Sequence, residues 1–160
     1  MTPRHFLLAV MIAAPVAVWA QASPALKAPF EAMRANVGKI SNAAERERWE
    51  TNVAIWQVKI GRADKLEPAD LAKMRASFDT MKANVAKITA AAEKERWQAN
   101  CDLWQVLLAA APNKVAKADR DKMRTTLDRI KANVARIAVP AERERWDANH
   151  QLWVLTLRTM

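Results

Sequence analysis

One tryptophan-containing segment occurs three times in this chain, and it constrains the fold more than any other feature. Its shared part reads basic-Ala-Asn-Val-x-basic-Ile, then four residues, then Glu-basic-Glu-Arg-Trp-x-x-Asn-x-x-aliphatic-Trp. The first tryptophan of each copy is Trp49, Trp97 or Trp146, at nearly equal spacing. A repeat of this length is typical of proteins in which each copy forms one supersecondary unit and packs on its neighbours.

Each copy predicts two helices with a break between them. The first helix carries apolar residues at steps of three and four, which in the second copy are Leu71, Met74, Phe78, Met81, Val85 and Ile88. The second helix has its own stripe, beginning at Trp49 in the first copy, and its phase does not continue that of the first helix. The chain must therefore break near residues 41–44. Pro140 supports this break, since proline suits the first position of a helix.

The sequence thus predicts an all-α fold of six helices in three tandem hairpins. The hairpins span approximately 26–61, 70–110 and 118–160, within a single domain over 23–160. Two arrangements are open at this point, a short α-solenoid in which hairpins stack in a row and a compact helical bundle.

Residues 1–22 have the layout of a secretory signal peptide, with Arg4 before an apolar stretch and Ala20-Gln21-Ala22 as the cleavage pattern. We therefore expect a periplasmic or secreted protein with no transmembrane segment after cleavage. The formal net charge of +9 favours anionic partners such as lipid headgroups, acidic proteins or peptides. Export argues against nucleic acid.

A repeated polar and aromatic face is the candidate binding site. At 100° per residue, Glu45, Trp49, Asn52 and Trp56 share one face of the second helix, and the other copies match. One interpretation is a hydrogen-bond network with Asn36 that recurs at each hairpin seam. The other is an open groove for a sugar, a peptide or a quaternary ammonium group. The candidate binding residues are Trp49, Asn52, Trp56, Trp97, Asn100, Trp104, Trp146, Asn149, Trp153, Arg48, Arg96 and Arg145. The Glu-basic-Glu-Arg runs predict solvent-exposed helical ion pairs.

Residues suited to catalysis or cofactor binding are scarce, so we expect neither an enzyme nor a cofactor. Cys101 and His150 fall at the same repeat position as Val53. If the helices of copies two and three lie side by side, the pair could bind copper together with core methionines. Cys101, the single cysteine, could alternatively join two chains in a dimer.

These features predict an exported, non-enzymatic binding protein whose repeated helical surface engages a protein, a peptide or an anionic envelope component. Two alternatives remain. One is a carrier that holds a small apolar or glycan ligand in a tryptophan-lined interior, and the other is periplasmic copper binding. A carrier needs a void between its tryptophans, whereas an interaction module packs them tightly.

Overall fold

The computed structural model describes residues 24–62, 66–111 and 113–160. The predicted signal peptide, residues 1–22, lies outside this part of the chain. The described residues form six helices: α1 (Pro24–Val37), α2 (Ala43–Gly61), α3 (Pro68–Ala86), α4 (Ala91–Ala110), α5 (Lys117–Val134) and α6 (Pro140–Thr159). The predicted all-α fold of three hairpins is confirmed.

Local chemistry accounts for the breaks inside the hairpins. Pro140 is the first residue of α6, where its missing N–H costs nothing. The Asn42 side chain accepts a hydrogen bond from the Glu45 backbone N–H at 2.9 Å and caps α2. An acidic residue lies in the first turn of each second helix, namely Glu45, Glu93 or Glu142. The second copy breaks in the same place, although its alanine-rich sequence could have continued the helix.

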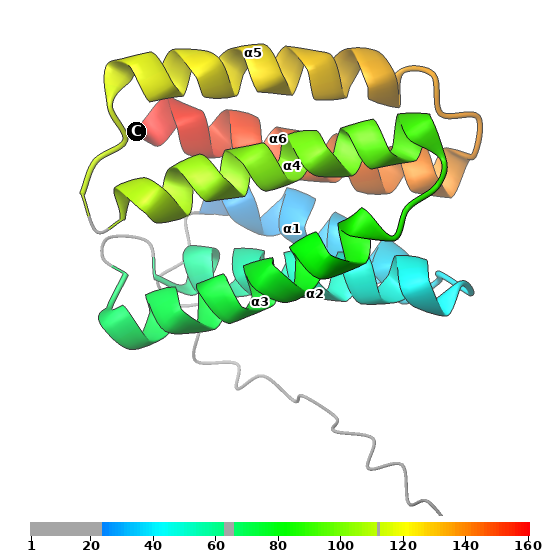
Figure 1. Cartoon of the computed structure of the whole chain (residues 1–160), viewed down its shortest axis with the longest axis horizontal. Helices are drawn as coiled ribbons and strands as arrows, with labels where there is room; N and C mark the ends of the chain where they lie inside the picture. The colour runs from blue at the N-terminus through cyan, green and yellow to red at the C-terminus, as the bar shows by residue number, and fades with distance from the viewer. Residues whose placement is uncertain (1–23, 63–65, 112) are drawn as a thin grey trace, which may run out of the picture.

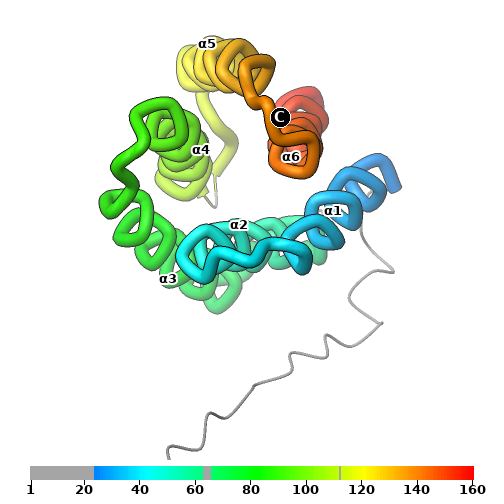
Figure 2. Tube along the Cα trace, turned by 90° about the vertical axis from the view of Figure 1, so that its right-hand side faces the viewer, coloured from blue at the N-terminus to red at the C-terminus, as the bar shows by residue number. Residues whose placement is uncertain are grey.

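The helices form a closed ring. Each helix packs against the helices before and after it in the chain, and α1 packs against α6 (Figure 1). Figure 2 is a view along the axis of the ring, and it shows the helices following one another around this axis in chain order. The structure therefore decides between the two predicted arrangements in favour of the compact bundle.

The three hairpin turns lie at one end of the bundle. In Figure 1 the turns between α1 and α2, α3 and α4, and α5 and α6 are all on the right, whereas α2 and α4 end on the left. Consequently α2, α4 and α6 run parallel to one another and start at the same end. The three copies are related by an approximate three-fold axis along the bundle.

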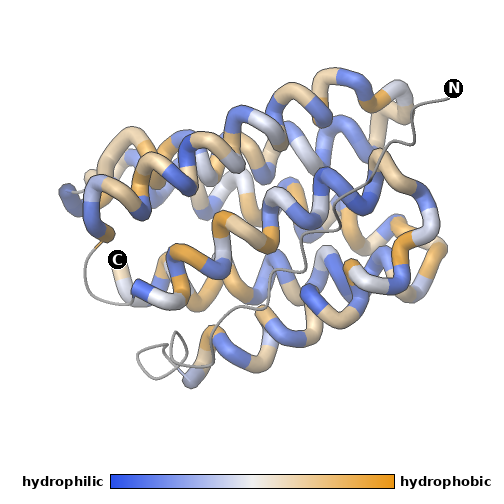
Figure 3. The backbone as a smooth tube through the Cα atoms, turned by 90° about the horizontal axis from the view of Figure 1, so that it is seen from below, coloured by the Kyte–Doolittle hydropathy of each residue, from blue (hydrophilic) through white to orange (hydrophobic). Residues whose placement is uncertain are grey.

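One apolar core fills the ring. The predicted first-helix stripes are buried, and Ile40, Ile88 and Ile137 stay buried although they lie just past the ends of their helices. Figure 3 shows hydrophobic and hydrophilic residues alternating along the helices, as expected when each helix buries one face. Among the described helices, none is long and apolar enough to cross a bilayer.

Candidate functional site

Two layers of tryptophan side chains fill the axis of the ring. Trp49, Trp97 and Trp146 form one triangle, with ring centroids 4.8, 4.9 and 5.0 Å apart. A second triangle has centroid distances of 4.6, 4.8 and 4.5 Å and contains Trp56, Trp104 and Trp153. All six contacts are edge-to-face, the geometry that aromatic quadrupoles favour. The rings pack tightly against each other, and each is at most 1% exposed.

A cyclic hydrogen-bond network, which we call the Asn ring, lies between the tryptophan layers. Asn52 donates to Asn149 (3.0 Å), Asn149 donates to Asn100 (3.0 Å), and Asn100 donates back to Asn52 (3.1 Å). Each amide oxygen also accepts a bond from a tryptophan Nε1 of the second layer, at 2.9–3.0 Å. Every buried amide oxygen thus accepts two bonds, which offsets the cost of burying it.

Three ion pairs close a second ring near the start of α2, α4 and α6, which carry the axial tryptophans and which we call the inner helices. Each arginine pairs with the glutamate of the following copy at 2.6–2.7 Å, and the pairs are Arg48–Glu93, Arg96–Glu142 and Arg145–Glu45. The predicted solvent-exposed pairs within one helix are therefore wrong for these arginines, whose residues are only 5–8% exposed. Arg96 and Arg145 also lie 5.9 and 5.8 Å from the tryptophan rings of Trp146 and Trp49, within cation–π range.

The polar network joins different copies. We expected Asn36 to bond within its own hairpin, but it donates to Glu144 of α6 at 3.3 Å. Asn133 of α5 likewise donates to Glu95 of α4 at 2.9 Å and accepts from Arg96 at 2.7 Å. Helical periodicity identified which residues face inward, but not which helix they face. The predicted seam network is thus corrected to one that holds successive copies together.

The structure brings the predicted binding residues together inside the core. Each Asn52 equivalent is fully buried, and the tryptophans and arginines around it contact one another. These side chains accordingly form no solvent-exposed groove in this structure. Ligand binding by them stays a prediction, and it would require the tryptophan layers to separate.

Cys101 and His150 have different surroundings. Burial, followed by nearby Asp102, raises the pKa of the Cys101 thiol to about 12, while Lys82 of α3 acts in the opposite direction. Burial and the nearby Lys131 of α5 lower the pKa of His150. The two side chains thus respond to charges on different hairpins. Among the described residues, no group of three or more His, Cys, Asp and Glu side chains is placed to hold a metal ion.

Six basic residues occur at the end of the bundle that carries the hairpin turns. Three lie in the turns and three in the first turn of the inner helices, and we call the set the basic end: Lys39, Lys87, Arg136, Arg46, Lys94 and Arg143. None of them forms an ion pair within the described ranges. From the sequence, Arg46, Lys94 and Arg143 were predicted to form solvent-exposed helical ion pairs, whereas Lys39, Lys87 and Arg136 received no role although they repeat in the shared motif.

Comparison with known proteins adds no assignment to this geometry. No protein-family model, curated protein or solved structure matches the chain.

Proposed function

We propose that this is an exported, non-enzymatic binding protein that engages an anionic envelope component through its basic end. The observation that carries the proposal is the unequal pairing of the repeated charges. The arginines Arg48, Arg96 and Arg145 are buried and each is paired with a glutamate, so their role is internal. The repeated cations of the basic end have no such partner in the described structure.

The fold supports this proposal by holding the basic end in a fixed geometry. Lys39, Lys87 and Arg136 are exposed residues of three equivalent turns at one end of the bundle. Arg46 and Arg143 donate to the backbone oxygens of Ile40 and Ile137, which braces the turns. A rigid cationic surface loses little conformational entropy on binding. Attraction to an anionic surface contributes about 1 kcal/mol per basic residue.

The alternative carrier function receives less support from this geometry. It needs space between the tryptophans, and the two layers pack with ring centroids 4.5–5.0 Å apart. The alternative copper function depends on Cys101 approaching His150 and on core methionines as further ligands. Two of these methionine sulfurs, those of Met33 and Met81, contact the amide nitrogens of Asn52 and Asn100 at 3.7 and 3.8 Å.

The test is binding to vesicles of phosphatidylglycerol mixed with phosphatidylcholine, compared with pure phosphatidylcholine. We expect binding only to the anionic vesicles, with affinity falling as salt increases. Replacing Lys39, Lys87 and Arg136 by glutamine should weaken it by about 100-fold, from about 1 kcal/mol per lost charge.

The matched control removes three exposed lysines distant from the hairpin turns, Lys27, Lys73 and Lys114. This variant has the same net charge and should bind at least about tenfold more tightly than the first. Equal losses in the two variants would contradict a binding role for the basic end. No binding of the wild-type protein to anionic vesicles at low salt would contradict the proposal as a whole.

A further inference from the structure

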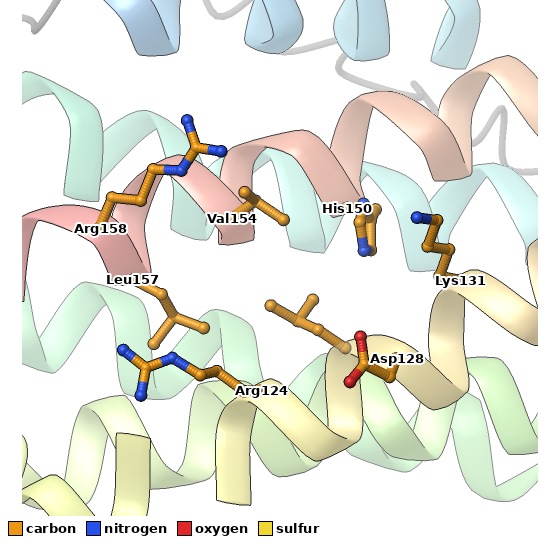
Figure 4. A pocket seen from close by; sticks show the side chains of 8 residues that line it. Arg124, Asp128, Lys131, His150, Val154, Leu157 and Arg158 are labelled. Atoms are coloured by element: carbon orange, nitrogen blue, oxygen red, sulfur yellow. The ribbon is translucent and has the colours of Figure 1, made fainter. Parts of the chain in front are cut away.

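A pocket of about 310 Å³ opens between α5 and α6 (Figure 4). Its apolar lining comes from Leu127 of α5 and from Val154 and Leu157 of α6. The volume is at the lower end of the range for small-molecule sites, about 300–1,000 Å³. The pocket therefore has room for a small ligand with an apolar body.

The rim of the pocket is predominantly cationic. Arg124, Lys131 and Arg158 line it, and Asp128 is the one carboxylate among the lining residues. Figure 4 shows Arg124 and Arg158 at one end of the pocket, and Lys131, Asp128 and His150 at the other.

The positive charge of the rim is only partly neutralised. Arg124 pairs with Asp121 at 2.6 Å. Neither Lys131 nor Arg158 has an ion-pair partner within the described ranges. The remaining positive charge suits a singly charged anionic head group.

The pocket lies where the third copy departs from the other two. Leu127 replaces phenylalanines that are buried at the equivalent positions, Phe30 and Phe78. In the second copy, an aromatic side chain occupies this position, with Lys82 lying 5.4 Å above the Phe78 ring. In the third copy, the smaller Leu127 lines the pocket instead.

The other changes in the third copy add the features of a ligand site. Val154 replaces a glutamine found in both other copies, and Arg158 replaces Gly61 and Ala109. His150, which Figure 4 shows at the pocket, replaces Val53 and Cys101. Half of the lining residues have thus changed within a repeat whose axial residues are invariant. Two of the changes, at Leu127 and Val154, put smaller apolar side chains in the lining of the pocket, and Arg158 adds a cation at its rim.

We propose that this pocket binds a small amphipathic carboxylate, with the apolar chain against Leu127, Val154 and Leu157 and the carboxylate near the unpaired Arg158. A guanidinium group presents parallel N–H donors that match a carboxylate in geometry. This inference goes beyond the proposed function, because it concerns a separate surface and a different ligand.

The test is calorimetric titration of the whole protein with sodium decanoate, with decanol as the neutral chain and acetate as the head group alone. We expect decanoate to bind about tenfold or more tightly than decanol, and acetate not to bind measurably. Substituting Arg158→Ala, which installs the residue of the second copy, should remove the preference for decanoate. Substituting Leu127→Phe, which installs the residue of both other copies, should abolish the binding of both decanoate and decanol.

The matched control is Phe78→Leu, which opens the equivalent space in the second copy where Ala109 stands in place of an arginine. It should gain no second decanoate site. Circular dichroism checks the fold of each variant. If Leu127→Phe disturbs the fold, the test rests on Arg158→Ala, because Arg158 is exposed and its removal should leave the fold intact. Absence of decanoate binding to the wild-type protein, or equal binding of decanoate and decanol, would overturn the proposal. Anionic vesicle binding should be unchanged in Leu127→Phe, so the two proposals can fail separately.

Discussion

The Asn ring makes a quantitative prediction about folding stability. Substituting Asn100→Ala removes the amide oxygen that accepts bonds from Asn149 Nδ2 and Trp153 Nε1, each at 3.0 Å. Both donors are fully buried, and the tightly packed tryptophans leave little space for a replacement acceptor. Each unsatisfied buried donor costs about 1–3 kcal/mol, so the substitution should cost about 4 kcal/mol in total. A domain of this size has about 5–15 kcal/mol of stability to lose.

The measurement is urea unfolding followed by tryptophan emission and circular dichroism. A loss of about 4 kcal/mol should lower the urea midpoint by about 2 M if the slope is near 2 kcal/mol per M. The exposed Gln98 of the same helix provides the control, and Gln98→Ala should change stability by less than about 0.5 kcal/mol. A cost below about 1 kcal/mol for Asn100→Ala would refute the argument that the ring satisfies buried donors.

The cyclic arrangement also predicts how two such substitutions combine. Asn52→Ala alone removes the oxygen acceptor of Asn100 Nδ2, which keeps only the weak contact with Met81 Sδ, and the acceptor of Trp104 Nε1. In the double variant Asn100 Nδ2 no longer exists, so one fewer donor is orphaned than in the two single variants together. The double variant should therefore cost about 1–3 kcal/mol less than the sum of the singles. Strict additivity would mean that the two asparagines act independently.

Cys101 of α4 and His150 of α6 each allow a further prediction. The pKa of Cys101 is raised from 9.0 to about 12, so at neutral pH the folded protein has about a thousandth of the thiolate that an unperturbed cysteine would have. Maleimide labelling, followed by mass spectrometry, should therefore be at least 100-fold slower in the native than in the urea-unfolded protein. Equal rates would show that Cys101 is accessible, and would favour the predicted disulfide-linked dimer. His150 has a lowered pKa because it is buried and lies near Lys131, against the opposing effect of Asp147 and Asp128. As the pH falls below about 6.5, the unfolded chain binds a proton that the folded chain resists, and stability is lost. Wild-type protein should therefore lose more stability between pH 7.5 and 5 than His150→Val, which installs the first-copy residue, and identical losses would contradict the assignment.

The sequence predicted local structure and buried faces well, for physical reasons. Apolar spacing identifies the face that a helix turns inward, and the stripes from Leu71 to Ile88 and around Trp49 are buried as expected. The change of phase between the two stripes located the hairpin break, and Pro140 marked it within one helical position. These signals depend on neighbouring residues alone, which a single sequence contains.

The partners of the inward-facing residues could not be obtained in this way. A stripe such as that of Trp49 and Trp56 is compatible with an open stack or a closed ring, since both bury the same face. Closure depends on how six indole rings fit around one axis, and this is a property of all three copies together. For the same reason Arg48 was expected to be solvated, although its glutamate partner lies in the next copy. The pocket was only partly anticipated, since position 150 was recognised as divergent while Leu127 and Arg158 were not.

The closure of the ring also changes how the covalent connections should be viewed. The contact between α6 and α1, which no loop joins directly, is as extensive as the contacts between linked neighbouring copies. The Asn ring and the three ion pairs likewise make no distinction between copies that are consecutive in the chain and copies that are not. The side chains thus specify a cyclic trimer of hairpins, of the kind that separate subunits build around a three-fold axis. In this protein the loops set the local concentration of the hairpins, and the axial side chains determine their symmetry.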